Sequence, residues 1–115
     1  MKLAKKQLPA GIIVLELTGR IHMGKDCAEI DREIQHHIQQ NDKRLIFDLT
    51  HVDHIDSAFI GQIVKTHSQL KKIGGGLRLA GATGMVESSL KLTQVHQAIA
   101  LFATAQQASE NFEPS

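Results

Sequence analysis

Residues 45–81 read LIFDLTHVDHIDSAFIGQIVKTHSQLKKIGGGLRLAG, and this stretch carries the strongest structural signals of the chain. Residues 44–50 form a near-continuous apolar run, which is typical of a strand buried on both faces at the centre of a sheet. Residues 57–72 then show the three- and four-residue spacing of an amphipathic helix. Three glycines at 74–76 end that helix, and residues 77–80 read as a short strand. The predicted helical stripe consists of Ile60, Ile63, Val64, His67 and Leu70.

The upstream sequence predicts a hairpin followed by a helix. Residues 3–8 and 12–18 flank Pro9-Ala10-Gly11, which is a turn signal, and the first of these strands is expected at the sheet edge. Residues 25–40 read as an amphipathic helix that ends near Asn41. Its apolar positions are Cys27, Ile30, Ile34 and Ile38.

The downstream sequence predicts shorter elements. Residues 84–92 favour a weak helix, and residues 98–102 have strand character. Thr104-Ala105-Gln106-Gln107 matches a capping box that opens a last helix, and residues 110–115 are expected to fray. Alternating strands and helices indicate an α/β fold, and the antiparallel hairpin makes its sheet mixed. We expect a single domain over residues 1–115, with an ordered core over about 3–109.

Composition excludes several classes of function. The chain has 115 residues, 42% hydrophobic content and a formal charge of +1, which fit one soluble domain. Balanced charge and an aromatic content of four Phe, without Trp or Tyr, make nucleic acid an unexpected partner. Cys27 stands alone, so no intramolecular disulfide can form. Because no apolar segment marks secretion or membrane insertion, we expect a cytoplasmic protein.

A polar cluster follows the central strand and raises two chemical alternatives. It contains His51, Asp53, His54, Asp56 and Ser57. A metal site requires three or four convergent ligands, but in an extended segment His51 and Asp53 face away from His54 and Asp56. A Ser-His-Asp hydrolase lacks its G-x-S-x-G elbow here, and a domain of this size leaves little room for a substrate pocket. We therefore predict neither a metal, nor a cofactor, nor enzymatic activity.

The position of Asp56 and Ser57 suggests a third alternative, a switch. Either residue could cap the helix that starts at 57, so the presence of both is redundant for capping alone. A helix N-terminus also tolerates added negative charge, and a phosphate adds about −1.5 to −2. Ser57 could therefore be modified without loss of the fold.

The same stretch resembles the signature region of the STAS domain of bacterial anti-sigma factor antagonists. The likeness comprises a buried strand ending in Asp-Leu, Asp-Ser at a helix start, a glycine four residues later, and Lys-Lys-x-Gly-Gly at the helix end. VLELTGRI and LKLTQV extend it over most of the chain. The resemblance implies the STAS (SpoIIAA-like) fold, a mixed sheet of about four to five strands with about four helices. It also implies a protein without enzymatic activity, whose serine is phosphorylated by a partner kinase.

The resemblance assigns roles to individual residues. Ser57 falls on the phosphorylated serine, Asp56 on the acidic residue before it, and Gly61 on a helix glycine. The sequence departs from the family pattern at Ala58, where a second serine is frequent, at Phe59, where glycine is usual, and at His22, where an aspartate is common. The predicted partner-binding residues are Asp56, Ser57, Ala58, Phe59, His22, Met23 and Met85.

Several of these side chains have an equally simple structural interpretation. Phe59, as the third helical residue, would lie in the core if it is not exposed, and Met85 and Val86 pose the same choice. His67 is predicted to be a hydrogen-bonded residue at the core boundary. Asp48 is predicted to satisfy local backbone donors near the end of its strand.

The sequence as a whole predicts a protein-binding phospho-switch. Unphosphorylated, it would dock onto an anti-sigma factor that is also a serine kinase, and phosphate on Ser57 would oppose that contact. A PP2C-type phosphatase would reset the switch. The alternatives are an accessory subunit of a lipid or anion transporter, as some STAS domains are, and a regulator of another kinase or phosphatase pathway. Nothing in the sequence specifies an oligomeric state.

Overall fold

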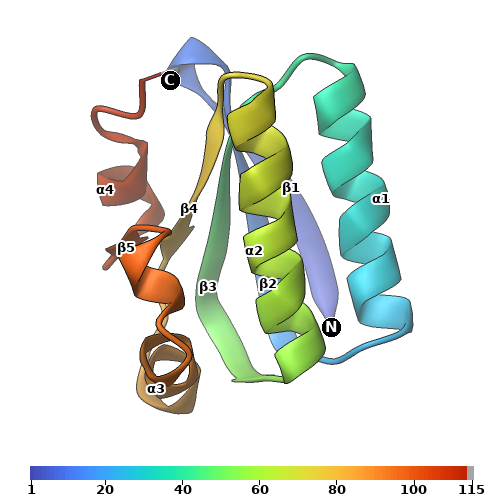
Figure 1. Ribbon diagram of the computed structural model, residues 1–115, viewed down its shortest axis with the longest axis vertical. Coiled ribbons are helices and arrows are strands. Elements are labelled where there is room, and N and C mark those ends of the chain that lie inside the picture. Colours follow the sequence, from blue (N-terminus) through green and yellow to red (C-terminus); the bar gives the residue numbers. More distant parts are fainter. Residues whose placement is uncertain (114–115) are drawn as a thin grey trace.

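The computed structural model describes residues 1–113 and contains a five-stranded mixed sheet in the order β1-β2-β3-β4-β5 (Figure 1). β1 pairs antiparallel with β2, and the other neighbours are parallel. This arrangement confirms the predicted α/β class and the mixed sheet. The strands are β1 (Lys2–Leu8), β2 (Ile12–Ile21), β3 (Arg44–Ile55), β4 (Gly76–Ala80) and β5 (Leu101–Phe102).

The predicted hairpin is confirmed. A 3₁₀ turn, η1 (Pro9–Gly11), joins β1 and β2 and brings Leu8 opposite Ile12. Ala10 and Gly11 both have positive φ, at 68° and 76°, which reverses the chain within three residues. β1 lies at the sheet edge as expected. The exposed lysines of this strand discourage further strand pairing at that edge.

β3 is the central strand, as its apolar sequence predicted. It lies between β2 and β4, and Leu45, Ile46 and Phe47 are fully buried. The strand extends beyond residue 50 because residues 51–55 continue to pair with β2. A bulge interrupts this pairing, and Val52 and Ile55 are both buried although they are three residues apart. Simple alternation therefore does not describe the histidine-rich segment.

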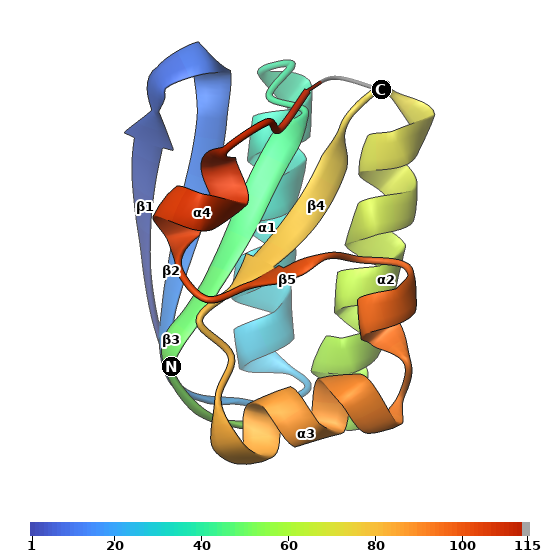
Figure 2. The same cartoon turned by 90° about the vertical axis from the view of Figure 1, so that its left-hand side faces the viewer.

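Helices cover both faces of the sheet. α1 (Lys25–Gln39) and α2 (Ser57–Lys72) pack on one face, and α4 (Ala105–Ser109) lies on the other (Figures 1 and 2). α3 (Gly84–Leu92) crosses the end of the sheet near the carboxyl end of β4 (Figure 2). The main core lies under α1, α2 and α3, and a smaller apolar cluster lies under α4. Of the predicted α1 stripe, Ile30 and Ile34 are fully buried.

α2 has the predicted bounds, and Ile63 and Leu70 of the predicted stripe are buried, but the buried face is rotated away from Val64. Its buried residues are Phe59, Ile63, Thr66 and Leu70, whereas Val64 is 46% exposed. The Phe59 ring stacks on Phe47 of β3, with ring centroids 6.1 Å apart, so the central strand selects the face that packs. His67 lies at the boundary of this face, where Nδ1 accepts a hydrogen bond from the Leu77 amide at 3.1 Å. Its predicted role as a hydrogen-bonded boundary residue is confirmed.

The C-terminal region differs most from expectation. β5 has only two residues, and the chain before it forms a 3₁₀ turn, η2 (Val95–Gln97). The Thr104 hydroxyl accepts a hydrogen bond from the Gln107 amide, which confirms the predicted cap of α4.

The prediction that the chain frays from residue 110 is wrong for residues 110–112. The Arg78 guanidinium donates to the carbonyl oxygens of Ala108, Glu110 and Asn111 and lies 4.2 Å above the Phe112 ring. Phe112 is 7% exposed, so this segment is packed. Residues 114–115 lie outside the described residues.

Candidate functional site

Asp56 is the capping residue of α2. Its Oδ1 accepts a hydrogen bond from the Phe59 amide at 3.0 Å, which satisfies one of the free N–H groups at the helix start. Its Oδ2 accepts a second hydrogen bond, from the Met23 amide at 2.8 Å. One carboxylate therefore closes the helix and also attaches the β2–α1 loop to it. The predicted partner role of Asp56 stays a prediction.

The electrostatic surroundings favour the charged form of Asp56. Partial burial opposes ionisation, but the backbone N–H groups of Met23 and Phe59 and the nearby His22 outweigh it. The pKa of the Asp56 carboxyl is therefore below its ordinary value, and the group is a carboxylate at neutral pH. At neutral pH a negative charge thus stands directly before Ser57.

Ser57 is the first residue of α2, and its side chain is exposed. Within the described chain its hydroxyl makes no hydrogen bond, because Asp56 already provides the cap. This resolves the redundancy seen in the sequence. The hydroxyl is not required for the helix start, and it is accessible to another protein.

His22 and His54 meet beside Asp56. Their Nε2 and Nδ1 atoms lie 3.3 Å apart, and the rings form an edge-to-face pair with centroids separated by 5.1 Å. The His22 amide also donates to the Asp26 carboxylate at 2.9 Å. The sequence did not reveal this pair, because the two residues are 32 positions apart and only the β2–β3 pairing joins them. His51 lies earlier in β3, opposite Thr18, and does not belong to this pair.

The histidine cluster does not assemble into a ligand set. Among residues 1–113, no group of three or more His, Cys, Asp or Glu side chains is arranged to hold a metal ion.

The predicted docking residues divide into exposed and buried groups. Met23 and Met85 are 71% and 73% exposed, so both are accessible to a partner. Phe59 is fully buried against Phe47, so its prediction as a partner-contact residue is wrong. The reason is that the third position of α2 faces the central strand, where a phenyl ring fills the core. Val86 is likewise buried, whereas its neighbour Met85 is not.

A groove between α1 and α2 runs alongside the site. Its volume is about 340 Å³, and Ala58 and Gly61 contribute to its wall. A Cβ atom placed on Gly61 would meet no atom within 4 Å, so the fold does not require glycine there. Gln62 of α2 bridges the two helices, because its Nε2 donates a hydrogen bond to the Cys27 carbonyl of α1 at 2.7 Å. Burial and the nearby carboxylates raise the pKa of the Cys27 thiol, which therefore stays protonated at neutral pH.

Known proteins with this fold provide the comparison. A candidate anti-sigma factor antagonist from Thermotoga maritima superposes with a TM-score of 0.87 at 19% identity, over 96% of this chain and 93% of that one. Phosphorylated SpoIIAA from Bacillus gives 0.76 at 15% identity, over 97% and 100%. A sulfate transporter family protein from Wolinella succinogenes gives 0.69 at 17% identity, over 90% and 85%. At these identities the likeness establishes the fold alone.

Sequence comparison identifies the family. No curated protein sequence matches the chain significantly. No helix within residues 1–113 has the length and hydrophobicity needed to cross a membrane. The model of the STAS domain family matches residues 4–108, which is most of the chain and includes most of β1, all of β2 to β5 and the Asp56–Ser57 helix start. The chain therefore belongs to the STAS domain family.

Proposed function

We propose that the protein is an anti-sigma factor antagonist whose binding to a serine kinase of the anti-sigma type is switched by phosphorylation of Ser57. The observation that carries this proposal is that Asp56 and Ser57 have different roles at the start of α2. Asp56 caps the helix, and the Ser57 hydroxyl is exposed and unbonded within the described chain. A kinase can therefore modify the serine without removing a contact on which the fold depends.

The unphosphorylated docking surface would comprise the α2 start and the loop attached to it. The Met23 amide donates to Asp56, so the loop that carries the exposed Met23 side chain is attached to the start of α2. An exposed apolar side chain beside small, partly exposed residues such as Ala58 suits a protein contact. Met85, also exposed, would add a second apolar contact from α3.

Phosphate on Ser57 would weaken this contact. It adds a charge of about −1.5 to −2 beside the Asp56 carboxylate, and a partner that covers the site must desolvate both groups. A coupling of about 1 to 3 kcal/mol changes affinity by about 5- to 150-fold, which is enough for a switch. The α2 N-terminus partly offsets the added charge, so the fold itself tolerates it. A PP2C-type phosphatase would restore the binding form.

The test compares the wild type with Ser57→Ala and Ser57→Asp in affinity capture from a lysate of the native organism. We expect wild type and Ser57→Ala to retain the same kinase and Ser57→Asp to lose it. Ser68→Asp, at an exposed serine on the same helix, is the matched control for added charge. Incubation of wild type with the captured kinase and ATP should add one phosphate at Ser57. Equal capture by all variants, or phosphate at another residue, contradicts the proposal.

A second candidate is regulation of a membrane transporter. It is favoured by the structural similarity to the sulfate transporter family protein of Wolinella succinogenes. In that case the same capture experiment would retain permease or ATPase subunits in place of a kinase. Regulation of another kinase or phosphatase pathway would retain signalling proteins unrelated to sigma factors.

A further inference from the structure

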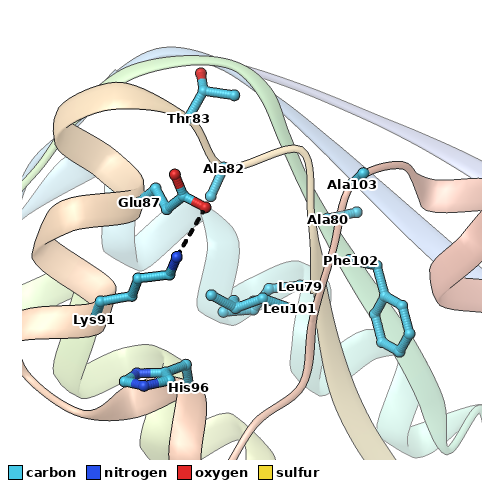
Figure 3. A pocket seen from close by; sticks show the side chains of 10 residues that line it. All are labelled: Leu79, Ala80, Ala82, Thr83, Glu87, Lys91, His96, Leu101, Phe102 and Ala103. Atoms are coloured by element: carbon cyan, nitrogen blue, oxygen red, sulfur yellow. Dashed lines mark ion pairs between the residues drawn. The ribbon is translucent and has the colours of Figure 1, made fainter.

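A cavity of about 520 Å³ lies between α3, η2 and the strands β4 and β5 (Figure 3). It contains no residue of the Asp56–Ser57 site. Its volume falls within the range of about 300 to 1,000 Å³ that small-molecule sites occupy. A single water molecule fills only about 30 Å³, so the cavity holds either a cluster of waters or a ligand.

The floor of the cavity is apolar. Leu79 of β4 and Leu101 of β5 are partners in the strand register, so their side chains lie side by side on one face of the sheet. Figure 3 shows both side chains on the floor, with Phe102 directed away from them. Leu101 is only partly buried, because β5 has two residues and α3 crosses the end of the sheet instead of covering this edge (Figure 2). An apolar ligand would complete its burial.

The rim of the cavity carries one lysine, Lys91, one carboxylate, Glu87, and the imidazole of His96. Lys91 Nζ lies 3.3 Å from Glu87 Oε2, one turn away on α3, and the two side chains are 56% and 44% exposed. An ion pair this exposed contributes little, so a ligand can replace it. Exposed His96 of η2 supplies a second nitrogen to the lining. Thr83, which precedes α3, does not use its hydroxyl to cap that helix.

We propose that this cavity binds a small amphiphilic monocarboxylate. The hydrocarbon portion lies on partly buried Leu101, beside fully buried Leu79, and the carboxylate lies between Lys91 and His96. The lining favours an anion over a cation because two nitrogen-bearing side chains face one carboxylate. The ligand would contact α3, which also carries the exposed residue Met85. Because Met85 is a predicted docking residue, ligand binding could then affect partner binding. The proposal does not depend on phosphorylation of Ser57.

The test is a titration of methyl-labelled protein, followed by NMR, with octanoate, octylamine and octanol as probes. We expect saturable shifts of the Leu79 and Leu101 methyl signals with octanoate, and weaker binding of octylamine. Lys91→Met should weaken octanoate binding by about 1.5- to 5-fold, which is the contribution of an exposed ion pair, and leave octanol binding unchanged. Glu87→Gln should strengthen octanoate binding, because it removes the competing carboxylate. Lys72→Met, at an exposed lysine of α2, is the matched control.

Three outcomes would overturn the proposal. The first is the absence of saturable shifts at Leu79 and Leu101 with octanoate. The second is equal binding of octanoate and octylamine, and the third is an equal effect of Lys91→Met and Lys72→Met. Leu101→Asp should replace the apolar floor by a carboxylate and abolish octanoate binding. If that variant does not fold, the substitutions of Lys91 and Glu87 at exposed positions still decide the question.

Discussion

Replacing Asp56 should separate the two tasks of its carboxylate. Asp56→Ala removes both the cap on the Phe59 amide and the bond to the Met23 amide. Asp56→Asn keeps one carbonyl oxygen, so it can accept from one of these amides but not from both. Asparagine caps helices nearly as well as aspartate, so this variant isolates the attachment of the loop. Ser57→Ala should disturb neither contact.

The expected magnitudes follow from the hydrogen bonds. Loss of an N-cap costs about 1 kcal/mol. The bond to Met23 has a charged acceptor but is partly exposed to water, so its loss costs about 1 kcal/mol more. Asp56→Ala should therefore destabilise the protein by about 2 kcal/mol and Asp56→Asn by about 1 kcal/mol. Ser57→Ala should stay within about 0.5 kcal/mol of wild type.

Urea unfolding followed by far-UV circular dichroism measures these differences, since the chain has no Trp or Tyr for fluorescence. A loss of about 2 kcal/mol lowers the urea midpoint by about 1 to 2 M. The pKa of Asp56 is lower in the folded state than in the unfolded state, so its charge stabilises the fold above the unfolded-state pKa. That contribution disappears as pH falls through the folded-state pKa. The difference between wild type and Asp56→Asn should therefore narrow below the ordinary carboxyl pKa of 3.8.

The reasoning is refuted if Ser57→Ala destabilises the protein as much as Asp56→Ala, because Ser57 would then be the cap. It is also refuted if Asp56→Asn equals wild type, because the Met23 bond would then contribute nothing. The result for Ser57→Ala matters for function as well. A neutral substitution shows that any change in partner binding arises from the missing hydroxyl and not from loss of folded protein.

Two further predictions concern packing, and the same unfolding assay measures both. Phe59→Ala removes a fully buried ring that stacks on Phe47, so it should cost about 3 to 5 kcal/mol; a loss below about 1 kcal/mol would contradict the burial. Gly81→Ala places a Cβ against Thr50 at a φ of 75° and should destabilise the fold, whereas Gly61→Ala meets open space and should stabilise α2 by about 0.5 to 1 kcal/mol. The opposite order of the two glycine variants would show that the close approach to Thr50 is wrong.

The elements that the sequence predicted well are those with local signals. The N-terminal hairpin depends on the turn residues 9–11, and the bounds of α2 depend on Asp56 and on the glycines after Lys72. Asp48 also behaves as predicted, since its Oδ1 accepts from the Thr50 amide two residues away. Each of these signals acts over a few positions of the chain, so it can be read without knowledge of the fold.

The features that the sequence did not predict depend on long-range contacts. The spacing of apolar residues placed Val64 on the buried face of α2, but Phe47 on β3 selects the face that contains Phe59. Arg78 orders the segment after α4 from about thirty positions away. In each of these contacts, the residues next to one partner in the sequence give no indication of the other partner.

The candidate site also combines features set by local sequence with features set by long-range contacts. The sequence alone determined that an acidic residue and a serine stand at the start of a helix after a buried strand, because capping and apolar patterning are properties of neighbouring residues. Only the tertiary structure decided that Asp56 is the cap, that Ser57 is exposed, and that His22 and Met23 lie beside them. The physical reason is that parallel pairing of β2 with β3 places the ends of both strands together, and no local pattern specifies that pairing.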